Sequence, residues 1–246
     1  MRIVIIVQAR MGSTRLPGKV LKSVLGKPLL GYLIERLQKV TAANQLIVAT
    51  TDKEADQAIV DYCQSQHVDV FRGSEENVLD RYIQAGKFAS ADILVRITAD
   101  CPIIDPQIVD QVITFYLNHD YHYVSNALMR TFPYGMEVEV FSLKDLIKAA
   151  EGKTSAEEQE HVTPVFYLHP QQFKIFNVTM PEDFSNYRLT VDTPADFLVV
   201  KHLIETLYPD KPFFNLNEMI FLLKEHPEWV QLNAHIQHKT LKGLGT

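Results

Sequence analysis

The chain has 246 residues and a formal net charge of −6 at pH 7, with 46% hydrophobic and 22% charged residues. This composition excludes a disordered chain and predicts one globular domain over residues 1–246. Cys63 and Cys101 are too few for a disulfide framework or a cysteine-ligated zinc site, and we expect both to be reduced thiols. The first apolar run, residues 3–7, is too short for a signal peptide or a membrane span, so we expect a cytoplasmic protein without membrane contact.

Positive charge is concentrated at the N-terminus. Residues 1–34 contain six Lys and Arg and no acid, although the chain as a whole is acidic. A basic segment in an acidic chain favours a small phosphorylated ligand over nucleic acid, because a polymer needs a wide basic face. We therefore expect an anion site near the N-terminus and no nucleic-acid partner.

The first predicted element is a buried strand over residues 2–8, which leads into a loop over residues 9–19. The loop reads Ala-Arg-Met-Gly-Ser-Thr-Arg-Leu-Pro-Gly-Lys, and its backbone N–H groups and guanidinium groups suit a polyphosphate. It is not a P-loop, because five residues separate Gly12 from Gly18 and Val20 follows Lys19 in place of Ser or Thr. A dinucleotide fingerprint is also excluded, since no G-x-G-x-x-G pattern follows the strand.

Helices and strands then alternate through the first half of the chain. The expected helices cover residues 28–40, 53–66 and 77–88, and the expected strands cover residues 45–51, 68–71 and 92–97. This alternation predicts an α/β fold with a mainly parallel central sheet and helices on both faces. Such sheets bind ligands at the carboxyl ends of their strands, where the loop 9–19 and the segment 98–102 both fall.

The second half of the chain has a different pattern. Residues 121–126 resemble a strand and residues 134–141 alternate, so 121–141 is expected to form a hairpin or small β extension that buries one face against a second copy in a homodimer. Helices are expected at 142–151, 155–168 and 215–225, and strands at 172–178 and 187–191. Thr193-Pro-Ala-Asp196 predicts a capping box that opens a helix to about Tyr208, and residues 226–246 are expected to be a polar tail.

Two aspartates are candidate magnesium ligands. Asp100 ends one predicted strand and Asp192 follows another, whereas Asp105 and Asp196 have capping positions that explain them. Magnesium takes oxygen ligands and often one or two protein carboxylates together with substrate phosphates. For Asp100 and Asp192 taken singly, an Asx turn in a loop is an equally good interpretation.

Other polar residues have less specific interpretations. Glu137 and Glu139 share one face of a predicted strand, which fits a solvated face or a ligand site equally well. His161 lies in an acidic helix, and a structural role is favoured over that of a catalytic base because no Ser or Cys partner is indicated. Cys101 is favoured as a small packed thiol over a nucleophile.

A series of motifs resembles the cytidylyltransferases that make CMP-activated acidic sugars, especially the branch named for spore coat polysaccharide biosynthesis protein F. The most specific are Gln8-Ala-Arg-Met-Gly-Ser-Thr-Arg-Leu-Pro-Gly-Lys-Val-Leu21 and Gly26-Lys-Pro-Leu29. The others are Arg72-Gly-Ser74, Val78-Leu-Asp-Arg-Tyr82, Val95-Arg-Ile-Thr-Ala-Asp-Cys-Pro102, Pro133-Tyr-Gly-Met-Glu-Val-Glu-Val-Phe141, Glu160-His-Val-Thr-Pro164 and Arg188-Leu-Thr-Val-Asp-Thr-Pro-Ala-Asp196. The resemblance extends to about residue 205, with the motifs in the family's order.

The resemblance implies a Rossmann-like nucleotide-diphospho-sugar transferase fold and Mg²⁺-dependent transfer of CMP from CTP to an acidic, keto-deoxy or sialic-type sugar, with release of pyrophosphate. Arg10, Lys19, Asp100 and Asp192 would be catalytic, and Asp100 and Asp192 would hold the metal. The nucleotide would contact Ala9, Arg10, Gly12, Ser13, Thr14, Arg15, Lys19, Arg72, Ser74, Asp80, Arg81 and Asp100. The sugar pocket and dimer contacts would include Asn126, Tyr134, Glu137, Glu139 and His161. One departure is Ala99, where relatives usually have glycine, because a methyl group there would crowd close backbone approach.

Three alternatives remain open at this point. One is a nucleotidyltransferase that uses another nucleoside triphosphate or a sugar 1-phosphate. The second is a glycosyltransferase, but Thr98 stands where its Asp-x-Asp motif has the first Asp. The third is a catalytically weak nucleotide-binding homologue that acts as a regulator.

Overall fold

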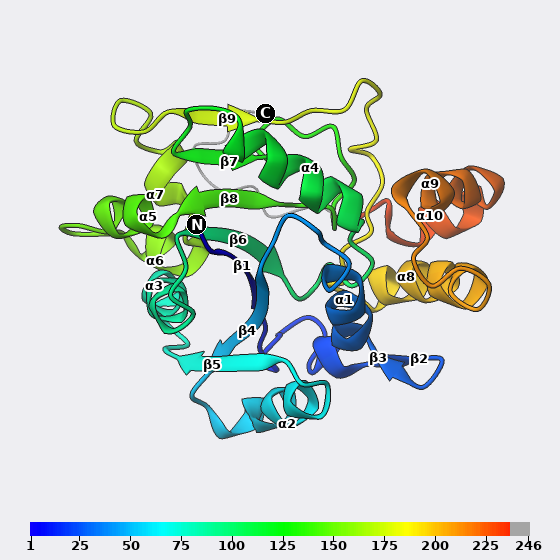
Figure 1. The fold of residues 1–246 in the computed structure, drawn as a ribbon. Coiled ribbons are helices and arrows are strands. Elements are labelled where there is room, and N and C mark those ends of the chain that lie inside the picture. The colour runs from blue at the N-terminus through cyan, green and yellow to red at the C-terminus, as the bar shows by residue number, and fades with distance from the viewer. Residues whose placement is uncertain (237–246) are drawn as a thin grey trace.

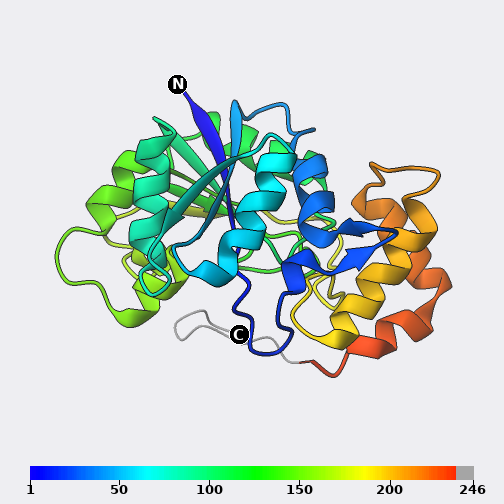
Figure 2. The same ribbon diagram turned by 90° about the horizontal axis from the view of Figure 1, so that it is seen from below.

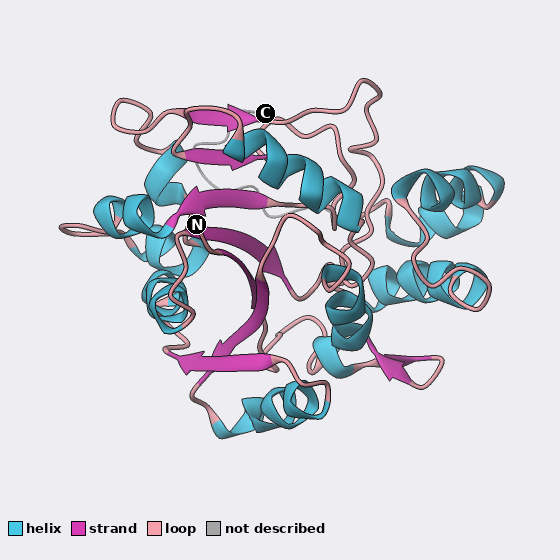
Figure 3. Ribbon diagram, in the orientation of Figure 1, coloured by secondary structure: helices cyan, strands magenta, loops and turns pink. Residues whose placement is uncertain are grey.

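The computed structural model of the protein describes residues 1–236, and a seven-stranded sheet forms its centre (Figure 1, Figure 3). The strands are β1 (Ile3–Gln8), β4 (Gln45–Thr51), β5 (Asp69–Gly73), β6 (Ile93–Thr98), β7 (Tyr123–Ser125), β8 (Glu139–Ser142) and β9 (Ile175–Asn177). Their order is β5-β4-β1-β6-β8-β7-β9, and β8 alone among them runs antiparallel to its neighbours. The predicted fold class, with a mainly parallel sheet, is confirmed.

Helices cover both faces of the sheet (Figure 1, Figure 2). They are α1 (Leu29–Leu37), α2 (Gln57–Ser65), α3 (Val78–Phe88), α4 (Pro106–Leu117), α5 (Leu143–Ala149), α6 (Ala156–His161), α7 (Pro164–Tyr167), α8 (Pro194–Leu207), α9 (Leu216–Glu225) and α10 (Pro227–Asn233). Short 3-10 turns, η1 (Lys19–Leu21) and η2 (Glu54–Asp56), and a small antiparallel sheet of β2 (Ser23–Val24) and β3 (Lys27–Pro28) complete the described elements. No helix within residues 1–236 combines the length and apolar character that a membrane span requires.

The continuous apolar run of β1 follows from its position inside the sheet. Ile3, Ile5 and Val7 pack into one core with α1, α4 and α8, while Val4 and Ile6 pack into a second core with α3, α5 and α7. A strand that is buried on both faces needs apolar residues at every position rather than at alternate ones. Gln8, at the end of β1, pairs in register with Thr98 of β6 and with Ala49 of β4, so the loop 9–19 and Asp100 leave the sheet at the same edge.

The second half of the chain requires several corrections. Residues 187–191 do not form a strand and make only an isolated bridge between Tyr134 and Arg188. The helix expected over 155–168 is divided into α6 and α7 at Val162, which has a φ of 70°. The β2–β3 pair was not predicted, and α10 occupies residues 227–233, where a polar tail was expected; residues 237–246 of that tail lie outside the described part.

Residues 121–141 join the main sheet instead of extending from it. β7 and β8 form an antiparallel pair, as in a hairpin, but β8 also pairs with β6, and only residues 139–142 are strand. Every residue of β7 and the first three residues of β8 are buried within the single chain. The alternation therefore does not mark a free face, and the homodimer stays a prediction.

Candidate functional site

The loop 9–19 is a defined structure that projects Lys19 toward the sheet edge. Met11 O accepts hydrogen bonds from Ser13 N at 2.9 Å and from Gly18 N at 3.1 Å, and Met11 N donates to Asp56 Oδ1 at 2.7 Å. Gly18 has a φ of 65°, which glycine adopts without strain, and the η1 turn begins immediately after it. The loop is thus closed on itself and anchored to the segment after β4.

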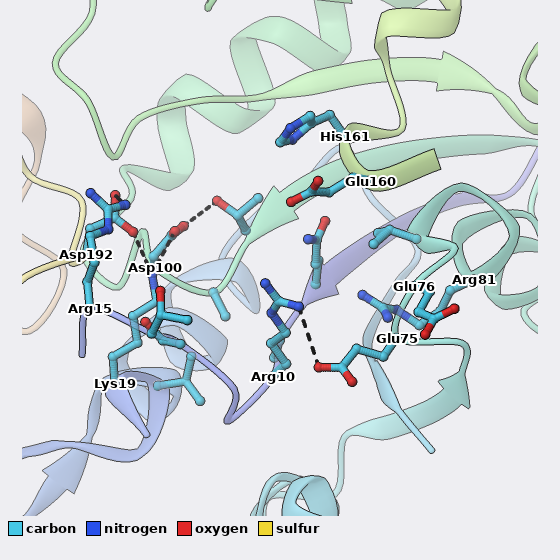
Figure 4. A pocket seen from close by; sticks show the side chains of 18 of the residues that line it. Arg10, Arg15, Lys19, Glu75, Glu76, Arg81, Asp100, Glu160, His161 and Asp192 are labelled. Carbon is cyan, nitrogen blue, oxygen red and sulfur yellow. Dashed lines mark hydrogen bonds and ion pairs between the residues drawn. The ribbon is translucent and has the colours of Figure 1, made fainter. Parts of the chain in front are cut away.

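The loop forms one side of a cavity of about 620 Å³, a size typical of small-molecule sites (Figure 4). Its other walls come from the start of α3, the end of β6, α6 and the segment before α8. The lining residues are Gln8, Ala9, Arg10, Ser13, Thr14, Arg15, Lys19, Val20, Glu75, Glu76, Val78, Arg81, Thr98, Ala99, Asp100, Ala156, Gln159, Glu160, His161 and Asp192. In the view of Figure 4, Asp100 and Asp192 lie toward one end of the cavity and Glu75, Glu76 and Arg81 toward the other.

Lys19 joins the two candidate metal carboxylates. Its Nζ lies 3.0 Å from Asp100 Oδ2 and 2.8 Å from Asp192 Oδ1. Burial lowers the pKa of Lys19, but the two carboxylates outweigh this effect and the net shift is upward, so the ammonium is charged. Burial also opposes ionisation of Asp100, yet Lys19 and the hydroxyl of Thr98, which donates at 2.5 Å, lower the pKa of Asp100 to about 2.

Backbone contacts bring Asp192 beside Asp100. The carbonyl of Asp100 accepts a hydrogen bond from Val191 N at 2.7 Å and another from Thr190 Oγ1 at 3.1 Å. These bonds hold the segment before α8 against the loop that follows β6. The two aspartates, 92 positions apart in the chain, consequently face the same ammonium.

Arg188 supports Asp192 from the buried side. Its Nη2 lies 2.9 Å from Asp192 Oδ2, and its Nε donates to Asp196 Oδ1 at 2.8 Å. Arg15 approaches the same Asp192 oxygen at 3.1 Å. The capping box of Asp196 is confirmed, but this fully buried carboxylate also binds Arg188 and accepts a hydrogen bond from Asn233 of α10 at 2.9 Å.

Asp100 and Asp192 offer a donor set that suits magnesium. Both reach a single ammonium position from different loops, and a hard cation with phosphate co-ligands needs only one or two carboxylates. Residues 1–236 contain no cluster of three or more His, Cys, Asp or Glu that could hold a metal ion without such co-ligands. The donor set fits magnesium if Lys19 turns to the phosphates, and the metal remains a prediction.

Most of the residues expected to contact the nucleotide line the cavity. Those that do are Ala9, Arg10, Ser13, Thr14, Arg15, Lys19, Arg81 and Asp100, whereas Gly12, Arg72, Ser74 and Asp80 do not. Arg72 donates to the carbonyls of Thr51 and Lys53, and the carbonyl of Ser74 accepts from Arg81. Arg72 and Ser74 therefore make contacts near the cavity but do not line it.

Of the five residues expected in the sugar pocket, His161 is the one that lines the cavity. Glu137 precedes β8 and binds Arg130 at 2.6 Å, whereas Glu139 lies inside the sheet, so the two do not share a strand face. Asn126 is buried and bonds to the backbone of residues 136 and 138, and the guanidinium of Arg130 lies 3.9 Å from the ring centre of Tyr134. These four residues contact other parts of the protein and do not line the cavity, and their role toward a sugar stays a prediction.

Sequence reasoning left several lining residues without a role. Thr98 bonds to Asp100, Glu75 lies 3.6 Å from Arg10, and Gln8, Glu76, Gln159 and Glu160 complete this group. The position of Gln8 and Thr98 at the ends of two adjacent parallel strands was a usable signal; the others carried none. Ala99 also lines the cavity and is 3% exposed.

Cys101 is buried beside the site. Burial, followed by Glu137 and Asp100, raises the pKa of its thiol well above the usual value. A protonated thiol is a poor nucleophile, which agrees with the interpretation as a packed residue.

The chain is similar to known proteins over most of its length. A family model described as cytidylyltransferase matches residues 4–228. The chain is 36% identical to spore coat polysaccharide biosynthesis protein SpsF of Bacillus subtilis over 92% of this chain and 95% of that protein. It is 34% identical to 3-deoxy-manno-octulosonate cytidylyltransferase of Geobacter metallireducens over 46% and 44% of the two chains. The structure of a cytidylyltransferase from Leptospira borgpetersenii superposes with a TM-score of 0.90 at 35% identity, covering 97% of this chain and all of that one.

Proposed function

Because this chain belongs to the cytidylyltransferase family, we propose that it transfers CMP from CTP to an acidic sugar and releases pyrophosphate. One observation carries the proposal: three cations of the loop 9–19 and two carboxylates from distant segments converge on one cavity of about 620 Å³. This is the combination of charges that transfer of a nucleotidyl group requires.

Arg10, Arg15 and Lys19 bind and neutralise the triphosphate. In the absence of ligand Lys19 is held between Asp100 and Asp192, so its ammonium already lies at the end of the cavity where the carboxylates are. Phosphate oxygens can replace these carboxylates as its partners without moving the loop. Pre-positioned cations cost no reorganisation when negative charge develops on the leaving pyrophosphate.

Asp100 and Asp192 would hold Mg²⁺, which supplies Lewis-acid neutralisation of the phosphate oxygens when bound. Release of Lys19 to the phosphates frees both carboxylates for this role. Arg188 keeps Asp192 oriented through the oxygen that Lys19 does not use. The chain needs no nucleophile of its own, since the acceptor hydroxyl attacks the α-phosphate directly.

We assign to His161, which lines the cavity, the role of receiving the proton of that hydroxyl. Burial lowers the pKa of its imidazole below the usual value, so the ring is neutral at pH 7 and can accept a proton. Glu160 and Gln159 lie beside it on the same wall of the cavity. We assign this wall to the acceptor because the cations for the triphosphate come from the opposite loop, as seen in Figure 4.

The names of the relatives support an acidic sugar as the acceptor. One similar protein is named for 3-deoxy-manno-octulosonate, a keto-deoxy acid, and another for spore coat polysaccharide. Surface polysaccharide synthesis is therefore the proposed setting. The proposal also includes that the enzyme is a homodimer and that it works in the cytoplasm, where CTP is available.

The test is a panel of CTP, UTP, ATP and GTP against octulosonate, sialic, pseudaminic and legionaminic acids with Mg²⁺. We expect pyrophosphate release with CTP and one acid, and a product whose mass equals that acid plus CMP. Omission of magnesium should abolish release. Release with another triphosphate or with a sugar 1-phosphate would refute the proposed substrates, and binding of CTP without turnover on any acceptor would favour the regulator.

A further inference from the structure

The wall that carries His161 ends in an unusual turn. Val162 has φ 70° and ψ −63°, and Thr163 N donates to His161 O at 2.8 Å, which together define a γ-turn of the positive-φ type. This conformation is strained for a β-branched residue, because a positive φ brings its side chain close to its own backbone. Such a turn persists only where the surrounding structure stabilises it, so the contacts around Val162 show what holds the turn in place.

Glu139 makes the contact that holds this turn. Thr163 Oγ1 donates to Glu139 Oε1 at 2.5 Å, and the Val162 side chain is fully buried. Pro164 then begins α7, so the chain cannot continue the α6 helix through the turn. The direction of His161 is thereby coupled to a carboxylate in the central sheet.

Glu139 is itself held firmly. It lies opposite Arg96 of β6 and Ser125 of β7 in register, and it forms a short ion pair with Arg96. Tyr123 donates a further hydrogen bond to Oε1 at 2.6 Å, and the residue is 7% exposed. Because this buried carboxylate has three partners within the protein, its position is fixed by the fold.

The same ion pair reaches a second part of the cavity. Arg96 Nη2 donates to Gln8 Oε1 at 3.3 Å, and Gln8 lines the cavity where β1 enters the loop 9–19. One buried pair therefore touches both the wall that carries His161 and the base of the loop that carries the cations.

We propose that Glu139 and Thr163 are positioning residues that hold the Val162 turn and so direct His161 toward the acceptor. The contact between His161 and the acceptor rests on the proposed function, whereas the positioning of His161 does not. Glu139 thus has a role behind the cavity in place of the sugar contact expected for it from the sequence.

Thr163→Val tests the proposal, because it keeps shape and burial but removes the hydroxyl, and Thr163→Ser is the matched control that restores it. The imidazole resonances of ¹⁵N-histidine-labelled protein, with His161 assigned through His161→Gln, report on the ring without turnover. We expect Thr163→Val to shift or broaden the His161 signals and Thr163→Ser to return them to the wild-type position. Unchanged His161 signals in folded Thr163→Val protein would overturn the positioning role.

Kinetic measurements test whether the positioning of His161 affects the transfer to the acceptor. We expect Thr163→Val to lower kcat/KM for the acceptor roughly ten- to hundredfold while KM for CTP stays within about twofold, since misplacement of a reacting group costs this much. The double variant with His161→Gln should be no slower than His161→Gln alone. If the two substitutions lower kcat/KM multiplicatively in the double variant, Thr163 does not act through His161, and the proposal is refuted. If Thr163→Val shows the ring shifts but the wild-type protein transfers no CMP, the proposed function and the acceptor contact are refuted and the positioning of His161 stands.

Discussion

Replacing Lys19 by methionine should weaken CTP binding with little loss of packing. Lys19 Nζ contacts Asp100 at 3.0 Å and Asp192 at 2.8 Å, and 13% of the side chain is exposed. A hydrogen bond to a charged group contributes about 1.5–3 kcal/mol, which corresponds to roughly a ten- to 150-fold increase in Kd. Methionine retains the length and apolar stem of lysine, so the effect reports the lost ammonium.

The same substitution should change the acid stability of the protein. Lys19 helps to hold the pKa of Asp100 at about 2, below its ordinary value of 3.8. The folded-state pKa is lowered, so the ionised carboxylate stabilises the fold above about pH 4, and this contribution of roughly 2 kcal/mol is lost as the pH falls toward about 2. Without Lys19 the pKa of Asp100 rises, although the hydrogen bond from Thr98 remains, so the loss of stability between about pH 4 and 2 should become smaller.

Two assays check these expectations. Calorimetric titration with CTP in the absence of metal measures the change in Kd, and urea unfolding between about pH 2 and 6 measures the change in stability. Lys22→Met is a suitable control, because Lys22 follows Lys19 closely but lies over the Phe197 ring instead of lining the cavity. An unchanged metal-free Kd for CTP in Lys19→Met, with the same pH dependence of unfolding as wild type, would refute the reasoning.

Four further predictions concern the metal site, two buried positions and the oligomeric state. Asp192→Asn should abolish most pyrophosphate release at limiting magnesium and change metal-free CTP binding little; near-normal release would remove Asp192 from the metal site. Asn233→Ala breaks two buried hydrogen bonds of 2.9 Å each, so the free energy of unfolding should fall by about 1–3 kcal/mol, which is seen as a lower urea midpoint. Gly135→Ala should be more damaging, because its Cβ would lie 2.6 Å from the Leu189 carbonyl carbon at a φ of 101°; thermal unfolding near the wild-type temperature would contradict this. Light scattering should give a dimer mass at micromolar concentration, and a mass of 28.1 kDa would contradict the homodimer.

Several elements could be predicted because their signals are local. The strand β4 matches its predicted bounds, and the caps Asp105 and Thr193 both begin helices in the structure. The loop 9–19 was recognisable from its cations and glycines alone. In each case the deciding interactions lie within a few residues along the chain.

Errors arose where tertiary packing overrides a local pattern. Residues 134–141 alternate like a half-exposed strand, but α4 and α7 cover both faces and the strand is limited to 139–142. Residues 187–191 have strand-like composition but bond to Tyr134 and Asp100 as an irregular segment. An alternating pattern does not reveal whether its polar positions meet water, a partner chain or a buried counterion.

The sequence by itself determined the family, the parallel sheet and the basic loop at its edge, since hydrophobic periodicity and short motifs are written along the chain. Only the tertiary structure decided which charges meet. Lys19 reaches Asp192 across 173 positions, Arg188 supports that carboxylate from the buried side, and Glu139 pairs with Arg96 inside the sheet. A charged side chain looks the same in the sequence whether it faces a ligand or a counterion, and burial by segments distant in the chain determines which of the two it contacts.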